Sequence, residues 1–366
     1  MGPMTKTMSG KNMHITLAQL RWHRLMRSGL ITPFASAEDC AEALIGVQAQ
    51  MSRAAALAIA ARIAGDFSFR KFEELLYRQR SLVRTWGQRN TLHTFRSADW
   101  PNLVAALGSR RSWAHGKFLE NGGSAVDCER LIAAIGKTLQ GRPPLTREAI
   151  AGQTGMEASG WGGLLIDAAY RGLLCDAGAR RFAHGMHWLP RRMEQPDPKT
   201  ASIALMRRYL RNYGPARPAD AAFWFGEKVA VVKQWLASLD LIEVVCEKTP
   251  LVALREDKNE LTSLAPPRST QGWPIVMLYR FDPLLLAHKG KDWIVPAQHY
   301  GKVWTAGGHV SGVILQKGVA VATWQYQKSA GRYGITLAPF SKTKISQRIQ
   351  EKVEQQEKFL GKFFLQ

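Results

Sequence analysis

Two glutamines separated by one residue, Gln48 and Gln50, stand in a short segment at residues 45–52. If this segment is extended, side chains at i and i+2 point the same way, whereas on a helix they diverge by about 200°. A primary amide is not a base near neutral pH, but it can orient a water molecule and turn its carbonyl dipole towards positive charge. On spacing alone, a pair that contacts only solvent or phosphate is the favoured interpretation.

The sequence on both sides of the pair predicts helices. Ser36 is placed to cap a helix, and Asp39 completes a capping-box spacing before a run with apolar residues at helical intervals. Gly46 is a plausible end for that helix. After the pair, Ser52 can cap an alanine-rich run over residues 53–63. The glutamines are therefore predicted to lie in a link between two helices.

The charge of the chain narrows the class of partner. The formal net charge is +21 and the isoelectric point is near 10.1. A charge of this size favours a polyanion, because each neutralised phosphate releases condensed counterions. No stretch of about 18 apolar residues is present, and no basic amphipathic helix with an aromatic face dominates. Nucleic acid is therefore favoured over a membrane surface.

Length and cysteine spacing bound the architecture. A chain of 366 residues is expected to form two or three domains. The four cysteines are far apart, without a Cys-x-x-Cys pair, which argues against a zinc ribbon, an iron–sulfur cluster and a disulfide framework. Four isolated thiols fit a reducing cytoplasm. The first twelve residues are polar and cationic and lack the apolar core of a signal peptide.

One theme occurs three times along the chain: helices followed by a short basic hairpin. We delimit the repeats as residues 14–125, 126–195 and 196–366. Helices followed by a hairpin are the order of a winged-helix domain. We therefore predict an α+β fold of three tandem winged-helix domains.

The last repeat carries additional elements. Strand-like segments bounded by Pro and Gly turns run from about residue 241 to 326. The chain closes with a basic helix over residues 341–364, whose charged face either touches phosphate or is only solvated. We expect a β-rich C-terminal region and a terminal basic helix.

Several segments carry a resemblance to a known family. They are Gly46–Gln50, Arg84–His93, Arg208–Leu210, Tyr213–Ala216, Asp220, Trp224, Phe281–Leu285 and Gly318–Trp324. In these segments the chain resembles the AlkZ-like family of bacterial DNA glycosylases, proteins of tandem winged-helix domains, some of which unhook interstrand cross-links. The similarity runs in the family's order over roughly residues 14–361.

The resemblance implies an active site. The family's catalytic signature is Gln-apolar-Gln in one branch and Gln-apolar-Asp in another, so the resemblance assigns Gln48 and Gln50 as catalytic. One departure is Asn90, where the family pattern implies glycine. The implied partner is double-stranded DNA with alkylated bases, without a cofactor or an obligate protein partner.

Glutamine chemistry restricts the substrate. Cleavage of an N-glycosidic bond passes through an oxocarbenium-like sugar. A neutral amide stabilises that cation weakly, so the site suits a base that already leaves easily, such as a cationic N7- or N3-alkylated purine. The predicted function is a monofunctional DNA glycosylase for such lesions, extending to interstrand cross-links.

Two other functions stay open. A non-catalytic winged-helix DNA-binding protein or regulator needs the charge and the wings but not the glutamine pair. Such regulators usually dimerise on paired half-sites, and the chain has no coiled-coil heptad, so we expect a monomer. An RNA-binding protein is weaker, because no aromatic-rich RNA-binding strand is present.

Five further residues are candidate DNA contacts. Arg84, Arg89 and His93 lie in the first wing-like segment, near the predicted lesion site. A salt bridge or a solvated strand edge is an equal alternative for the two arginines, and hydrogen-bonded packing is favoured for His93. Arg180 and Arg181 lie at a hairpin turn, where cations have little structural use, and are stronger candidates.

The sequence predicts neither a catalytic carboxylate nor a metal site. Asp282, before Pro283, is the most tempting carboxylate, but an Asx-type turn is favoured over a catalytic role. His184 and His187 have no third ligand nearby in sequence, so no metal site is predicted.

Overall fold

A computed structural model describes residues 13–157, 162–189, 194–341 and 345–365 of the chain. The fold mixes helices and strands in the α+β manner, as predicted, and the strands of the described residues form four small sheets. The first twelve residues, whose sequence lacks the apolar core of a signal peptide, lie outside the described residues.

The first region folds as helices around a three-stranded sheet. Ser36 caps α2 as predicted, because its hydroxyl accepts the Asp39 N–H at 3.0 Å. The predicted cap by Ser52 was wrong, since α3 begins at Ser52 itself and has no side-chain cap. The elements are α1 (Leu17–Arg27), α2 (Ala37–Ala43), β2 (Val47–Gln48), α3 (Ser52–Ala60), α4 (Phe69–Glu73), η1 (Glu74–Arg78), β3 (Leu82–Trp86), η2 (Gln88–Asn90), β4 (Leu92–Arg96), η3 (Ser97–Asp99) and α5 (Trp100–Leu107).

The sheet of this region fixes the direction of the glutamine segment. Its strand order is β2-β4-β3, and both pairings are antiparallel. Gln48 lies opposite His93, and Thr85 lies opposite His93 on the other side. Directly opposed residues in an antiparallel pair project from the same face. The glutamines lie between α2 and α3, as predicted, and Val47 and Gln48 form the strand β2.

The second region is a smaller unit of the same kind. Its strands form an antiparallel sheet in the order β5-β7-β6. A separate core of buried side chains lies between its helices. The elements are α6 (Trp113–Glu120), α7 (Ala125–Leu139), β5 (Leu145–Thr146), α8 (Arg147–Thr154), α9 (Leu165–Tyr170), β6 (Cys175–Asp176), β7 (Arg181–Ala183) and α10 (Gly185–Trp188).

The third region begins as helices and a hairpin. The N-terminal strand β1 (Met13–Ile15) pairs in parallel with β8, so the sheet order is β1-β8-β9. A segment from the start of the chain therefore completes a sheet formed more than 200 residues later. The other elements are α11 (Pro198–Tyr213), α12 (Pro218–Phe225), α13 (Val229–Leu236), β8 (Leu241–Cys246), β9 (Thr249–Leu254), η4 (Arg255–Asp257) and α14 (Lys258–Thr262).

The C-terminal part is β-rich, as predicted. A four-stranded antiparallel sheet in the order β10-β11-β12-β13 carries α17 against its last strand, where Glu357 accepts the Ile335 N–H at 2.8 Å. The basic helix begins at Gln347, six residues later than predicted. The elements are β10 (Val276–Leu278), α15 (Pro283–Leu286), η5 (Ala297–His299), α16 (Tyr300–Val303), β11 (Gly312–Gln316), β12 (Val319–Ser329), β13 (Arg332–Pro339) and α17 (Gln347–Leu365).

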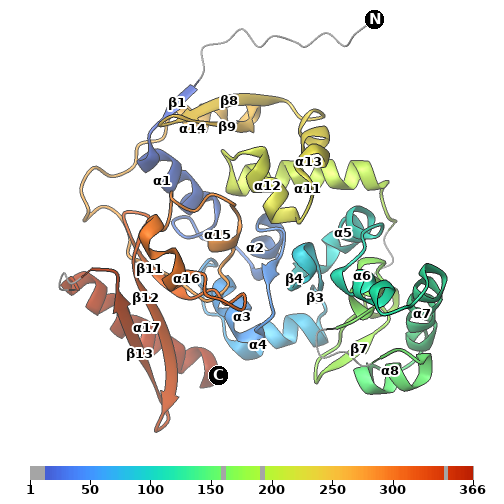
Figure 1. Cartoon of the computed structure of the whole chain (residues 1–366). Helices are drawn as coiled ribbons and strands as arrows, with labels where there is room; N and C mark the ends of the chain where they lie inside the picture. The colour runs from blue at the N-terminus through green and yellow to red at the C-terminus, as the bar shows by residue number, and fades with distance from the viewer. Residues whose placement is uncertain (1–12, 158–161, 190–193, 342–344, 366) are drawn as a thin grey trace, which may run out of the picture.

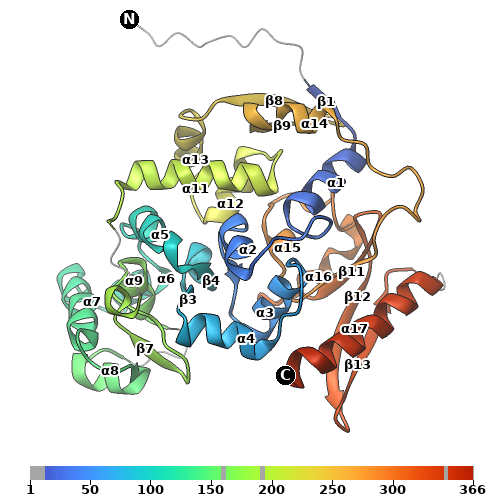
Figure 2. The ribbon, with the colours of Figure 1, turned by 180° about the vertical axis from the view of Figure 1, so that it is seen from behind.

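The first and third regions share one core, which runs from α1 to α17. Figures 1 and 2 show the second region on one side of the first region and the C-terminal sheet with α17 on the other, with α3 and α4 between them. The β6–β7 and β12–β13 hairpins extend towards the same lower side of the molecule in both views. No helix among the described residues is long and apolar enough to cross a membrane.

Candidate active site

Gln48 is held in one orientation by Arg89. The Gln48 side chain is buried, and its Oε1 accepts a hydrogen bond from Arg89 Nη2 at 3.2 Å. Arg89 Nη1 donates to the Trp224 carbonyl at 2.7 Å, and the guanidinium carbon lies 4.6 Å from the centre of the Trp224 ring. Because a guanidinium only donates, the Gln48 carbonyl must face Arg89. The Gln48 amide nitrogen therefore points away from Arg89.

Gln50 is exposed and is anchored to the neighbouring strand. Its Oε1 accepts the Leu92 backbone N–H at 2.9 Å. The residue between the glutamines is bound to the same strand, because the Ala49 N–H donates to the Leu92 carbonyl at 2.6 Å. Both side-chain carbonyls are thus held by one segment of chain, η2 and the start of β4.

Arg84 binds the backbone of the glutamine segment. Its Nε donates to the Ala49 carbonyl at 3.0 Å, and its Nη1 forms a 2.8 Å ion pair with Asp176 on β6. The Tyr77 hydroxyl also donates to Asp176, at 2.9 Å. Arg84 therefore fixes the backbone between the two glutamines and ties it to the second region.

The Arg89 charge acts on the Gln48 amide. Burial lowers the pKa of Arg89 to about 10, so the guanidinium is still protonated at neutral pH. A cation bound to an amide carbonyl withdraws electron density from the amide and strengthens its N–H groups as donors. The arrangement presents Gln48 mainly as a hydrogen-bond donor.

His93 is a neutral, buried neighbour of this cluster. Burial, and next the Arg89 charge, lower the pKa of His93 to about 3. Its Nδ1 lies 2.9 Å from the Thr91 carbonyl, so Nδ1 carries the proton and Nε2 is an acceptor. Within the described part of the chain, Nε2 has no hydrogen-bond partner. The structure leaves His93 no exposed surface in the free protein.

Arg180 and Arg181 belong to the β6–β7 hairpin. Arg180 is in the turn of the β6–β7 hairpin and Arg181 begins β7, and both side chains are exposed. Arg181 donates to the Pro144 carbonyl at 3.3 Å. Over the described ranges, no hydrogen bond or ion pair joins either arginine to the glutamine segment.

Three residues of the site were not recognised in the sequence. Asp176 forms an ion pair with Arg84, and the Trp224 carbonyl accepts a hydrogen bond from Arg89. The Tyr170 hydroxyl donates to Asn90 in the loop before β4. Trp224 belongs to a segment that carries the family resemblance, but the role of its backbone carbonyl has no signature in sequence.

The comparisons with known proteins identify the family. Residues 41–363 match the family described as DNA glycosylase AlkZ-like. The chain belongs to the AlkZ-like DNA glycosylase family. An interstrand DNA cross-link repair glycosylase from Streptomyces sahachiroi is 29% identical over 315 residues, which are 79% of this chain and 82% of the relative. The solved structure of the DNA glycosylase AlkZ from Streptomyces sahachiroi superposes with a TM-score of 0.81 at 25% identity, covering 94% of this chain and 95% of that chain.

A cleft adjoins the glutamine site of this AlkZ-like glycosylase. Its volume is about 500 Å³, and it lies between the first, second and third regions beside Arg89. Two of its cations are already engaged, since Arg89 binds Gln48 and Arg110 forms a 2.8 Å ion pair with Glu227. The lining consists of Arg89, Asn90, Arg110, Arg111, Tyr170, Ala219, Ala222, Phe223, Gly226, Glu227, Val229 and Lys289.

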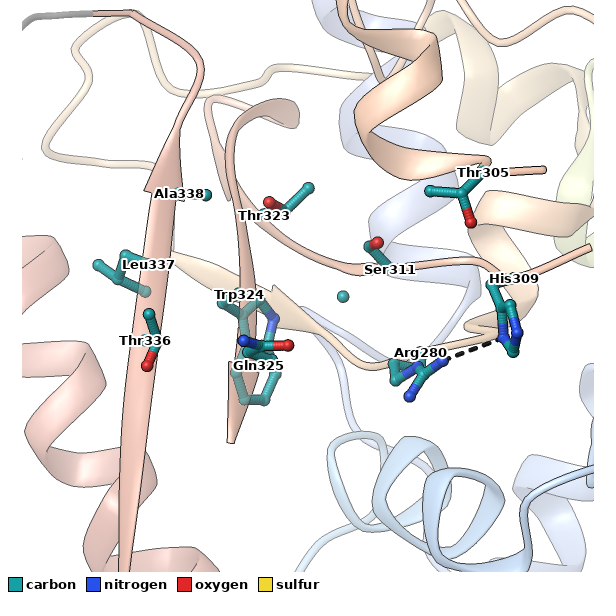
Figure 3. A pocket seen from close by; sticks show the side chains of 11 residues that line it. Arg280, Thr305, His309, Ser311, Thr323, Trp324, Gln325, Thr336, Leu337 and Ala338 are labelled. Atoms are coloured by element: carbon teal, nitrogen blue, oxygen red, sulfur yellow. Dashed lines mark hydrogen bonds between the residues drawn. The ribbon is translucent and has the colours of Figure 1, made fainter. Parts of the chain in front are cut away.

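A second cavity of this AlkZ-like glycosylase lies on the C-terminal sheet (Figure 3). It measures about 450 Å³ and is lined mainly by neutral polar side chains, together with Arg280 and His309. Arg280 Nη2 lies 3.2 Å from His309 Nδ1. None of the residues predicted from the sequence to form the site lines this cavity.

Asp282 has a structural position in this AlkZ-like glycosylase. Its Oδ1 accepts the Leu284 N–H at 3.0 Å and so caps α15, which confirms the predicted turn. The same oxygen pairs with Arg62 at 2.7 Å, and both side chains are fully buried. Among the described residues, no group of three His, Cys, Asp or Glu side chains could hold a metal ion.

Proposed function

We propose that this DNA glycosylase hydrolyses the N-glycosidic bond of cationic N7- or N3-alkylated purines in duplex DNA, with Gln48 and Gln50 as its catalytic residues. The observation that carries the proposal is that the carbonyls of both amides are held in place by donors, Arg89 Nη2 and the Leu92 N–H. No hydrogen bond joins either amide to a carboxylate within the described residues. A neutral site of this kind suits a leaving group that is already positively charged.

We assign Gln50 the role of orienting the attacking water. Its carbonyl accepts the Leu92 N–H with one lone pair and keeps the other. That second lone pair accepts a hydrogen bond from the attacking water. The negative end of the same carbonyl dipole then faces the sugar cation. The C1′–N bond breaks with its electron pair going to the base, and water then adds to C1′ and loses a proton to solvent. An aspartate could take the same role, which fits the Gln-apolar-Asp pattern.

We assign Gln48 the role of donating hydrogen bonds to the DNA. Its carbonyl faces Arg89, so its Nε2 carries the free hydrogen-bonding groups. Two N–H donors, polarised by a buried cation, suit an acceptor such as a phosphate oxygen or the edge of the departing purine. Pre-oriented donors of this kind need no rearrangement during the reaction.

The predicted DNA contacts divide into two groups. The exposed Arg180 and Arg181 are proposed to bind the phosphate backbone. The hydrogen bonds of Arg84 and Arg89 and the burial of His93 support a role in holding the glutamine segment rather than in reaching phosphate.

We also propose a domain organisation, a further class of substrate and a monomeric state. In each of three small sheets, β2-β4-β3, β5-β7-β6 and β1-β8-β9, the last two strands along the chain follow helices. This order supports three tandem winged-helix domains over residues 14–125, 126–195 and 196–366. The cross-link repair activity named for the Streptomyces relative supports cross-linked purines as further substrates. The enzyme is proposed to act as a monofunctional monomer in the cytoplasm.

Removing the two hairpin cations is expected to weaken the dependence of DNA binding on salt. For Arg180→Ala/Arg181→Ala, the slope of log K against log salt should fall by up to about 2, because each phosphate contact contributes about 0.9. The measurement is fluorescence anisotropy with duplex DNA between low and moderate salt. A charge-matched control is Arg130→Ala/Lys137→Ala on α7, which should leave the slope unchanged. Equal slopes for wild type and the hairpin variant would contradict the contact.

The proposed function is tested by product analysis. Wild-type protein is incubated with a duplex that carries one N7-methylguanine, and the free base and the DNA strand are measured separately. The expected result is release of N7-methylguanine, leaving an intact strand with an alkali-sensitive abasic site. Tight, salt-dependent binding to the duplex without base release would instead indicate a DNA-binding protein that does not excise this lesion.

A further inference from the structure

The loop that carries Arg89 has an unusual backbone. Arg89 has φ 60° and ψ 24°, and Asn90 has φ 57°, so two successive residues adopt the left-handed conformation. Residues other than glycine rarely adopt the left-handed backbone conformation, although asparagine does so more readily than most. A backbone of this kind persists when the surrounding structure holds it.

Tyr170, from α9 in the second region, holds this loop. Its hydroxyl lies 2.7 Å from Asn90 Oδ1 and 3.1 Å from the Gly87 carbonyl. Burial raises the pKa of Tyr170, so the hydroxyl keeps its proton and remains a donor. On the opposite side, Gln88 Nε2 donates to the Ile45 carbonyl at 2.9 Å. The loop is therefore fixed both by the first region and by the second.

We propose that Tyr170 and Asn90 are positioning residues for base excision. The Tyr170 hydroxyl fixes the loop through Asn90, the loop fixes Arg89, and Arg89 fixes the orientation of the Gln48 amide. Because this role rests on the proposed function of Gln48, it deepens that function and assigns no separate activity. The second region then contributes to the reaction itself and not only to binding.

Asn90 is the residue at which the chain departs from the family pattern. Glycine would allow the same backbone but offers no side-chain acceptor to Tyr170. Asparagine keeps the left-handed conformation accessible and adds the 2.7 Å hydrogen bond. Neither Tyr170 nor Asn90 carries a charge, so their loss is expected to change the rate of the chemical step and not the affinity for DNA.

The test separates rate from affinity. Single-turnover release of N7-methylguanine and duplex affinity are measured for Tyr170→Phe, Asn90→Gly and Asn90→Asp. We expect Tyr170→Phe and Asn90→Gly to react about tenfold more slowly with affinity within about twofold of wild type, since small misplacements of a catalytic group are costly. Asn90→Asp keeps an acceptor for the hydroxyl and should restore most of the rate. The double variant should be no slower than Tyr170→Phe, because that change already removes the bond to Asn90 together with the bond to the Gly87 carbonyl.

A matched control is Tyr300→Phe, which removes a hydroxyl that donates to Asp292 at 2.6 Å and, within the described part of the chain, makes no hydrogen bond to the glutamine segment. It should react at the wild-type rate. A wild-type rate for Tyr170→Phe, or a loss of affinity equal to the loss of rate, would overturn the positioning role. If Gln48→Ala abolishes release while Tyr170→Phe does not slow it, only this role fails. If the wild type releases no base, the proposed function fails, and this role fails with it.

Discussion

Replacing Gln48 by glutamate is expected to slow base excision by on the order of 10²–10³-fold, whereas Gln50→Asp is expected to stay within about tenfold of wild type. The two glutamines are chemically alike, so the asymmetry comes from their surroundings. A carboxylate at position 48 would pair with the Arg89 guanidinium, which already binds the Gln48 carbonyl at 3.2 Å. It would have no N–H group to offer to the DNA.

Position 50 has different requirements. The Gln50 oxygen only accepts, from the Leu92 N–H at 2.9 Å, and its side chain is exposed. An aspartate there also accepts hydrogen bonds from water and can take up a proton from it. The measurement is single-turnover release of N7-methylguanine, with duplex affinity and thermal stability as controls for folding. Full activity of Gln48→Glu would contradict the assignment of the Gln48 amide as a donor.

Replacing Asp282 by alanine is expected to lower the free energy of unfolding by about 3–5 kcal/mol, because it leaves a buried charge without its partner. Arg62 and Asp282 are both fully buried and join the turn after α3 to the start of α15. The same substitution also removes the cap of α15, where Asp282 accepts the Leu284 N–H. The measurement is urea unfolding followed by circular dichroism.

A double variant separates this structural role from catalysis. Arg62→Met/Asp282→Leu removes both charges and should be less destabilised than Asp282→Ala, because no unpaired charge remains. Excision by the folded fraction of either variant should stay near the wild-type rate, since Asp282 is buried away from solvent. Unchanged stability of Asp282→Ala, or loss of excision by fully folded protein, would contradict this account.

Features set by neighbouring residues were predictable from the sequence. Ser36 caps α2 through a bond to Asp39, three residues away, and the strand-like segments predicted from about residue 241 begin with β8 and β9. The position of the two glutamines in a link between two helices followed from the same kind of local signals. In each case, local hydrogen bonds and apolar periodicity decide the structure.

Features set by distant residues could not be predicted. The pairing of β1 with β8 and the contact of Arg89 with the Trp224 carbonyl join segments more than 100 residues apart. The orientation of the Gln48 amide depends on that second contact. A backbone carbonyl is present at every residue, so nothing in the sequence marks the one that receives Arg89. The bond of the Tyr170 hydroxyl to Asn90 also joins residues that are 80 positions apart in the sequence.

The most direct test of the glutamine site compares wild type with Gln48→Ala/Gln50→Ala on a duplex that carries one N7-methylguanine. We predict that the double variant, with thermal stability unchanged and with the duplex fully bound, releases the base at least about 10²-fold more slowly. That result would place the chemistry at the anchored amides. Release at the wild-type rate by the double variant would contradict the assignment and would require a different active site.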